Sequence, residues 1–363
     1  MQAVIALLSL AAASAAAPAI EQVAAPSTQI KALPLHSVGR VVRSREGYRR
    51  QWPGSYFEAA FRGADAYLKI GPGAVSLRVR VDGGATEKLV KPSPGYYRLT
   101  GLADGIHRIR VDVASESQAE PTLLGGIYAP AGKALPAPAP RARQIEFVGD
   151  SHTVGYGNTS DTRECSGDQV WQTTDTTLGL AALTAAKYDA DYQVNAISGR
   201  GIVRNYNGSQ GTTLPRAYPF ALLDSSHRYH DRAWRPQVVV VALGTNDFST
   251  PLQAGEPWQT REQLHADYER TYIAFLRTIR AKDPKAFILL WSTDMSEGEI
   301  ASEVAKVAAA LEHSGDRRVG ALTVGNLALS GCHYHPSLAD DAKIADAIGR
   351  YLDGRGDIWT RPR

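Results

Sequence analysis

Hydrophobic positions along the chain follow two different periods, and the change lies near residue 143. Before it, short runs mostly alternate apolar with polar residues and are separated by turn sequences such as Gly71-Pro-Gly73 and Asp82-Gly-Gly84. The runs cover residues 55–61, 66–70, 75–81, 96–99 and 107–113. Alternation with period two indicates strands that bury one face. Because no helical period separates them, the pattern predicts a β-sandwich domain of jelly-roll kind over residues 37–130.

After residue 143 the pattern becomes that of an α/β domain. Strand-like runs alternate with helical patterns; the strands are expected at 144–148, 192–196, 237–243, 286–291 and 319–324, and the helices near 170–188, 261–281, 299–313 and 338–352. A continuous apolar run such as Val238-Val-Val-Val-Ala-Leu243 is typical of a parallel strand buried on both faces. The sequence therefore predicts a parallel sheet with helices on both sides over residues 143–355. The Pro/Ala-rich residues 131–142 predict a stiff linker between the two domains.

Chemically useful residues follow the ends of these predicted parallel strands. The first strand ends at Gly149-Asp-Ser151, the second at Ile197-Ser-Gly-Arg-Gly201 and the third at Gly244-Thr-Asn-Asp247. The last strand leads through a loop into Gly331-Cys-His-Tyr-His-Pro336. The carboxyl ends of parallel strands meet at one edge of the sheet. A serine, a glycine N–H, a side-chain amide and an imidazole are therefore expected in one crevice.

These groups are the ones that acyl transfer requires. Ser151 would be the nucleophile and His335 the base that takes its proton. The N–H groups of Ser151 and Gly199 and the amide of Asn246 would stabilise the negative oxygen of the intermediate.

The four blocks, in this order, resemble the SGNH (GDSL-type) hydrolase superfamily, which is named after Ser, Gly, Asn and His. Residues Gly149–Gly157, 198–206 and 243–248 are most similar to carbohydrate esterase family two, which also carries a jelly-roll domain ahead of the hydrolase domain. The resemblance covers about residues 37–355 and implies a three-layer flavodoxin-like hydrolase domain. It also implies an acetylesterase acting on plant polysaccharides, with a leaning toward the primary 6-hydroxyl of glucose or mannose units, and no cofactor. The matching positions assign Ser151 as nucleophile, Gly199 and Asn246 as oxyanion donors and His335 as base.

One position departs from the superfamily pattern. An aspartate usually stands three residues before the histidine and orients it, but here that residue is Cys332. A thiol cannot stabilise an imidazolium as a carboxylate does. We therefore expect a Ser–His dyad whose base is oriented by the backbone carbonyl of a nearby loop residue, such as Cys332 or His333, as is thought for some members of family two. The alternative is a distant acid, for which Asp294 is a candidate because it follows the fourth strand.

Other polar and aromatic residues near the blocks allow more than one interpretation. Asp150 is expected to cap the turn after the strand, and His152 receives no role. The residues proposed for substrate binding are Tyr334, Arg204 and Tyr206, with Arg200 and Asn205 beside them; for this loop, structural hydrogen bonding is the open alternative. Trp52 is expected in the core rather than against a sugar. His333 and His335 lack a clear third ligand, so no metal site is predicted.

The N-terminus and the cysteines bear on where the protein works. Residues 1–17 read as a secretory signal without a basic n-region, which predicts a secreted or periplasmic protein, and residues 18–35 as a flexible lead-in. No other segment approaches the length of a membrane span, and no cysteine near the cleavage point suggests a lipid anchor. Cys165 and Cys332 either form one disulfide or remain two small buried hydrophobes. A net charge of +3 over 363 residues gives no sign of nucleic-acid binding.

Three functions remain open at this point. The first is a carbohydrate O-acetylesterase whose partner is an acetylated polysaccharide or oligosaccharide. The second is another SGNH esterase or lipase, since the blocks fix the reaction but not the acyl group. The third is a non-catalytic polysaccharide-binding protein that keeps the fold but not the activity.

Overall fold

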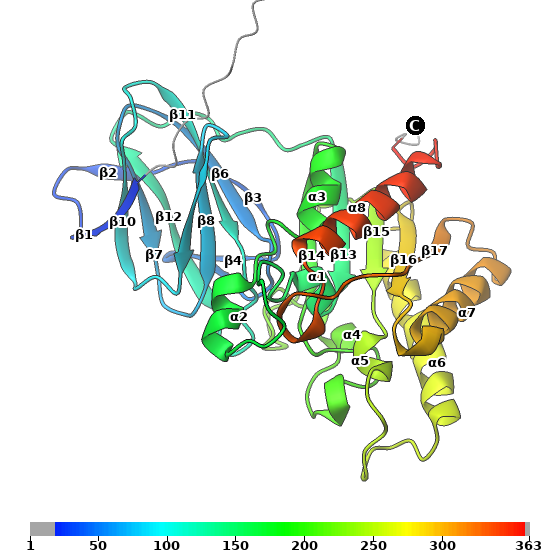
Figure 1. The fold of residues 1–363 in the computed structure, drawn as a ribbon. Coiled ribbons are helices and arrows are strands. Elements are labelled where there is room, and N and C mark those ends of the chain that lie inside the picture. The colour runs from blue at the N-terminus through cyan, green and yellow to red at the C-terminus, as the bar shows by residue number, and fades with distance from the viewer. Residues whose placement is uncertain (1–18, 360–363) are drawn as a thin grey trace, which may run out of the picture.

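The computed structural model describes residues 19–359, which form two domains lying side by side (Figure 1). The expected signal segment, residues 1–17, lies outside the described residues.

The N-terminal domain consists of two antiparallel sheets. The first has the order β1 (Ala19–Val23), β10 (Gly95–Thr100), β7 (Ala66–Ile70), β12 (Thr122–Pro130), β5 (Gly47–Arg50) and β4 (Val42–Ser44), with β2 (Ile30–Ala32) also paired to β12. The second has the order β3 (His36–Val38), β6 (Tyr56–Arg62), β11 (Ile106–Val113), β8 (Ser76–Val81) and β9 (Thr86–Val90). Alternate side chains of both sheets, among them Phe57, Leu68, Val79 and Val111, form a shared core. The alternating pattern therefore predicted a two-sheet domain correctly.

The segment expected to be a flexible lead-in is instead partly sheet. Strand β1 pairs with β10 along the edge of the first sheet, and β2 pairs with β12. The expectation, based on the Ala/Pro/Ser content of residues 18–35, is wrong because β10 and β12 offer free edges to which the segment's backbone can bond. Among the described residues, the pairing of the first sheet thus already includes Ala19–Val23, ahead of residue 37.

The second domain is a parallel sheet between two helical layers. Its strands lie in the order β14 (Ala190–Ala196), β13 (Arg143–Gly149), β15 (Val238–Ala242), β16 (Phe287–Thr293) and β17 (Val319–Val324). Numbered from β13, this order is 2-1-3-4-5, the flavodoxin-like arrangement. The long helices are α3 (Leu180–Lys187), α6 (Arg261–Lys282), α7 (Glu299–His313) and α8 (Leu338–Asp353).

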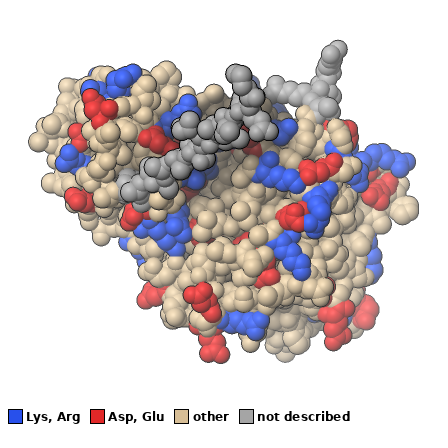
Figure 2. Space-filling view, turned by 45° about the horizontal axis from the view of Figure 1, so that its top comes forward, with Lys and Arg blue, Asp and Glu red and all other residues tan. Residues whose placement is uncertain are grey.

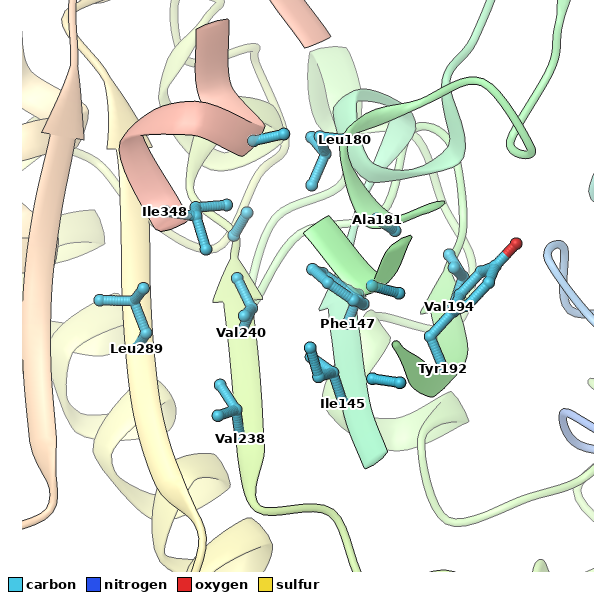
Figure 3. Close-up of a cluster of buried hydrophobic side chains, with 14 of the residues drawn as sticks. Ile145, Phe147, Leu180, Ala181, Tyr192, Val194, Val238, Val240, Leu289 and Ile348 are labelled. Carbon is cyan, nitrogen blue, oxygen red and sulfur yellow. The ribbon is translucent and has the colours of Figure 1, made fainter. Parts of the chain in front are cut away.

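Each face of the parallel sheet has its own hydrophobic core. On one face Phe147 and Val240 pack with Leu180 of α3 and Ile348 of α8 (Figure 3). On the other, the intervening strand residues, such as Val241, pack with side chains of α6 and α7. Burial on both faces explains why these strands are almost wholly apolar.

The helix expected near residues 170–188 is two helices. The first, α2 (Gly167–Thr173), ends before a Thr-Asp-Thr-Thr run, and α3 begins only at Leu180. The Asp175 carboxylate accepts from the N–H and hydroxyl of Thr177, and the N–H of Thr176 donates to Ala114 of the sandwich. Polar and β-branched side chains that bond locally compete with helix formation, so the helix breaks there.

Buried charges join the two domains. The Arg40 guanidinium of the sandwich lies 3.1 Å from the Glu146 carboxylate on β13, and both side chains are buried. Arg141, in the linker, bonds both Glu58 of β6 and Asp191 of β14 at 2.9 and 2.8 Å. The linker also bonds to β6 through the N–H of Leu135 and the carbonyl of Ala60. The domains are therefore fixed against each other.

The outer surface carries charges of both signs. On the face shown in Figure 2, lysine and arginine side chains lie among aspartates and glutamates rather than forming one continuous patch. Within residues 19–359, no helix is both long and apolar enough to cross a membrane.

Candidate active site

Ser151 lies where β13 passes into a short helix at one end of the parallel sheet. The helix α1 (Ser151–Val154) begins at Ser151, and the Asp150 side chain caps it by accepting from the N–H of His152 at 3.1 Å. The expected capping role of Asp150 is therefore confirmed. A Cβ on Gly149 would lie 2.1 Å from Thr153 Oγ1, so the close turn of the helix requires glycine there.

His335 reaches Ser151 from a loop 184 residues away in sequence. Its Nε2 atom lies 2.8 Å from Ser151 Oγ. Its Nδ1 atom lies 2.9 Å from the Cys332 carbonyl oxygen and 3.1 Å from that of His333. Since carbonyl oxygens only accept, Nδ1 donates and Nε2 is left in the neutral ring as the acceptor for the serine hydroxyl. The imidazole is oriented by carbonyls, as expected for a dyad.

The loop that carries His335 is held from several sides. Cys165 and Cys332 form a disulfide, which resolves the open question about the two cysteines. The N–H of His333 donates to the Arg163 carbonyl at 2.6 Å, and its ring lies 2.9 Å from the Cys165 carbonyl and 3.0 Å from the Tyr156 hydroxyl. Thus Cys332, in place of the usual aspartate, contributes a carbonyl to the base and a covalent bond to the loop.

Burial keeps the imidazole neutral. It lowers the pKa of His335 to about 4, although the bonds to the Cys332 and His333 carbonyls act in the opposite direction. The neighbouring His152, whose ring centroid lies 5.5 Å from that of His335, has its pKa lowered to about 3, again mainly by burial. A neutral His335 can accept a proton from Ser151 at neutral pH.

Two backbone N–H groups at the strand ends lack a protein hydrogen-bond partner among the described residues. Within residues 19–359, the N–H groups of Ser151 and Gly199 have no hydrogen-bond acceptor. Gly199 has a φ of +80°, and a Cβ there would meet nothing within 4 Å, so the peptide borders open space. Both N–H groups are available to a negatively charged oxygen.

The Asn246 amide departs from the expected arrangement. Asn246 lies in α5 (Thr245–Phe248), and its Nδ2 donates to Asp150 Oδ2 and to the Arg200 carbonyl, both at 3.0 Å. We expected this amide to point into the same space as the two N–H groups, but without substrate both of its hydrogens are engaged. An oxyanion can gain this donor only by sharing or replacing one of those bonds.

The residues proposed for substrate binding separate into exposed and buried ones. Tyr334 and Tyr206 are 63% and 54% exposed. Arg204 is only 2% exposed and bonds Glu256 through two nitrogens, at 2.7 and 2.9 Å. Its assignment to substrate binding is wrong, because its guanidinium is fully used inside the loop. Asn205 is also buried and bonds the carbonyls of that loop.

Two further expectations concern Trp52 and Asp294. Trp52 is 1% exposed and its indole N–H donates to the Phe220 carbonyl, so the core position is confirmed. Asp294 follows β16 as expected, but its carboxylate accepts from the N–H of Asn326 and does not bond His335. Within residues 19–359, no group of three or more His, Cys, Asp and Glu is arranged to hold a metal ion.

Sequence reasoning missed four contributors. The Tyr156 ring packs on the base, its centroid 4.4 Å from that of His335. The Asp247 carboxylate accepts from the N–H groups of Ile202, Val203 and Arg204 and so shapes the loop after Gly199. Glu116, together with Gln118 on the same segment of the sandwich domain, bonds the backbone of Ser198. Tyr156 and Asp247 lie inside the recognised blocks, whereas nothing in the local pattern indicates Glu116 or Gln118.

Comparisons with known proteins find matches over both domains. Residues 37–138 match the family model "Carbohydrate esterase 2 N-terminal", and residues 147–343 match the "GDSL-like Lipase/Acylhydrolase family". An acetylxylan esterase / glucomannan deacetylase from Cellvibrio japonicus is 43% identical over 343 residues, which are 93% of this chain and 94% of that protein.

The chain belongs to the GDSL-like esterases, as a family two carbohydrate esterase. A solved carbohydrate esterase superposes with a TM-score of 0.86 at 40% identity, covering 91% of this chain and 100% of the other. A family two esterase from Clostridium thermocellum, solved in complex with cellohexaose, gives a TM-score of 0.79 at 27% identity and covers 92% of this chain and all of its own. The expected family is thereby confirmed.

Proposed function

We propose that this family two esterase is a carbohydrate O-acetylesterase in which Ser151 and His335 form the catalytic dyad. The observation that carries the assignment is the 2.8 Å contact between Ser151 Oγ and His335 Nε2, with Nδ1 held by two carbonyls. The enzyme is a serine carboxylic-ester hydrolase, as its family implies. The relative from Cellvibrio japonicus deacetylates xylan and glucomannan by its name, which supports acetyl esters of plant polysaccharides as substrates.

The reaction follows from the geometry in two halves. Ser151 Oγ attacks the acetyl carbonyl carbon while His335 Nε2 takes the hydroxyl proton. The carbonyl oxygen becomes negative and is stabilised by the N–H groups of Ser151 and Gly199, with Asn246 as the third donor. His335 then gives its proton to the departing sugar oxygen, which leaves an acetyl-enzyme. Water attacks this ester with His335 again as base and releases acetate.

The carbonyl-bound base explains why no aspartate is needed. The carbonyls of Cys332 and His333 fix the ring and its tautomer, and their dipoles stabilise part of the positive charge that develops on His335. The disulfide from Cys332 to Cys165 keeps one of those carbonyls in place.

The substrate site extends from the dyad over exposed aromatic rings. Tyr334 stands beside the base, and Tyr206 follows the Gly199 loop, bonding the Gly199 carbonyl through its own N–H at 2.9 Å. An exposed ring can pack on the apolar face of a pyranose. The cellohexaose complex of the Clostridium thermocellum relative and the glucomannan named for the Cellvibrio japonicus relative support a polysaccharide with glucose or mannose units. The acetyl group at the primary 6-hydroxyl is the position we favour.

The location and the type of sandwich belong to the same proposal. The apolar, alanine-rich residues 1–17 support export, which fits a polysaccharide substrate outside the cytoplasm. The two antiparallel sheets of the N-terminal domain are of the kind that the jelly-roll assignment requires.

The experiment is ester turnover by the wild-type protein and by Ser151→Ala. We expect release of p-nitrophenol from p-nitrophenyl acetate, its loss in Ser151→Ala, and little turnover of the octanoyl ester. Preference for the octanoyl ester would favour a lipase, and no turnover by the folded wild type would favour a binding protein. Acetate release from acetylated glucomannan and acetylated xylan then identifies the polysaccharide.

A further inference from the structure

The sandwich domain reaches the oxyanion loop through one short segment, residues 115–118, which follows β11. The Gln118 side-chain nitrogen donates to the Ser198 carbonyl at 3.1 Å. The Glu116 carboxylate accepts from the Ser198 N–H at 2.9 Å. Both backbone groups of Ser198 are therefore bonded by the other domain.

The Ser198 carbonyl belongs to the same peptide unit as the Gly199 N–H. In a trans peptide the C=O and N–H point in opposite directions within one plane, and no cis bond occurs within residues 19–359. A donor that fixes the carbonyl on one side consequently fixes the N–H on the other. Gln118 thus determines the direction of the Gly199 N–H from the opposite side of the same peptide.

This peptide has an accessible alternative orientation. The N–H of Arg200 donates to the Ile197 carbonyl at 3.3 Å, which closes a turn with Ser198 and Gly199 at its centre. Gly199, at the third position, has a φ of +80°, the value of a type II turn. A type I turn keeps the same ends but has its central peptide rotated by about 180°. That rotation would turn the Gly199 N–H away from the site.

The segment that carries Gln118 is itself firmly held. The Ser117 N–H donates to the Gln51 carbonyl at 2.9 Å, and the Gln51 side chain donates back to the Ser117 carbonyl at 3.0 Å. The same Gln51 side chain accepts from the N–H of Leu223 in the hydrolase domain at 2.8 Å. The segment is thus bonded to both domains.

We infer that Gln118, assisted by Glu116, is a positioning residue for the oxyanion hole, so that the sandwich domain takes part in catalysis. Gln118 holds the Ser198–Gly199 peptide in the type II orientation and keeps its N–H directed at the developing oxyanion. The inference rests on the proposed hydrolysis at Ser151 and goes beyond it, because it assigns the first domain a role in the transition state.

The test compares Gln118→Ala and Gln118→Glu with the wild type on p-nitrophenyl acetate. Gln118→Ala loses the donor and should lower kcat about ten-fold, less than the roughly 10²–10³-fold loss on removing an oxyanion donor outright. Gln118→Glu keeps the size but opposes the Ser198 carbonyl with negative oxygen, so its kcat should fall further. KM should stay within about two-fold in both, because the effect falls on the transition state. Gln118→Lys supplies a new donor and should recover most of kcat.

A second measurement separates positioning from loss of structure. An alkylboronic acid that forms a tetrahedral adduct on Ser151 should bind the variants more weakly, in proportion to their loss of kcat. Gln259→Ala and Gln259→Glu are the matched controls, since Gln259 is exposed and its side chain makes no hydrogen bond within residues 19–359. They should retain wild-type values.

Each outcome bears on one claim. A kcat of Gln118→Glu within two-fold of the wild type, or a change confined to KM, would overturn the positioning role. Loss of activity in Ser151→Ala alongside normal Gln118 variants would leave the esterase assignment standing. Full activity of Ser151→Ala would instead overturn the proposed function.

Discussion

The two halves of the proposed dyad are positioned by different kinds of structure. Ser151 follows a strand buried on both faces and starts a capped helix, so regular hydrogen bonding and apolar packing fix it. His335 lies in a loop in which His333 and Tyr334 both have positive φ, and a disulfide and side-chain bonds fix it. The nucleophile depends on the core of the domain, whereas the base depends on a few individual contacts. Substitutions should therefore affect the two sides differently.

The largest effect should come from removing the base. His335→Ala leaves Ser151 without a proton acceptor, so we expect kcat to fall about 10⁶-fold, as in other serine hydrolases that lose the histidine. His230→Ala, on an exposed loop, is the control. A loss of less than a hundred-fold would mean that another group takes the proton, and the packed neighbour His152 would be examined next.

The second-largest effect should come from removing Asn246, the side-chain donor proposed for the oxyanion. Asn246→Ala should lower kcat about 10²–10³-fold with KM nearly unchanged, because an oxyanion donor acts on the transition state. The amide is engaged with Asp150 and the Arg200 carbonyl when substrate is absent. If kcat held and thermal stability fell, those two bonds would be the whole role of Asn246.

The success of the sequence predictions also differs between the nucleophile, which regular structure positions, and the base, which individual contacts position. Period-two and apolar runs gave the strands, and strand ends gave Ser151, Gly199 and Asn246, because packing repeats along the chain and leaves a pattern. The contacts of His335 gave no such pattern. The carbonyls of Cys332 and His333 were predicted only because they lie near His335 in the sequence, and both bond its Nδ1. Every residue has a carbonyl acceptor, so no residue type marks the one that is used. The buried place of Arg204 and the reach of Gln118 likewise depend on loop paths, which long-range contacts determine.

Loss of the disulfide should lower the stability of the protein clearly but should change kcat only a little. Cys165→Ala removes the covalent bond between Cys165 and Cys332, which lie 167 residues apart in the sequence. Loss of a native disulfide typically lowers the free energy of unfolding by about 2–5 kcal/mol. Other bonds still hold the loop, including that from the Cys332 N–H to the Gly157 carbonyl, so kcat of the folded protein should fall only a few-fold. Denaturant unfolding and kinetics on the same samples measure both quantities. Unchanged stability would contradict the prediction.

The pH dependence should report the carbonyl-bound base. Activity needs neutral His335, whose pKa is lowered to about 4, mainly by burial. The rate should therefore hold through mildly acidic pH and fall only as the pH drops through about 4. The stability of the fold should change in the same direction. Because the imidazole is buried in its neutral form, the free energy of unfolding falls as the pH drops below the unfolded-state pKa of about 6.5 and levels off near the folded-state pKa.

A second titrating group, the Asp150 carboxyl, complicates that profile and calls for a matched variant. Burial raises the pKa of Asp150 to about 7, against the opposing effect of the bond from the His152 N–H. If its protonation disturbed the cap, activity would already fall near neutral pH. Comparing kcat/KM against pH in the wild type and Asp150→Asn separates the two groups. A fall near 7 that disappears in the variant belongs to Asp150, and a fall near 4 present in both belongs to His335.

The smallest effect should come from the acid that a triad would need. Asp294→Asn keeps the size of the side chain and an oxygen that can accept from the Asn326 N–H, the bond that this carboxylate makes at 3.1 Å. Since both partners of His335 Nδ1 are carbonyls, the change should leave kcat within a few-fold. Neutralising the aspartate of a true triad costs roughly 10⁴-fold. A loss of that size would mean that Asp294 reaches the base during turnover, and the His335 loop would then be mobile rather than fixed by its disulfide and carbonyls.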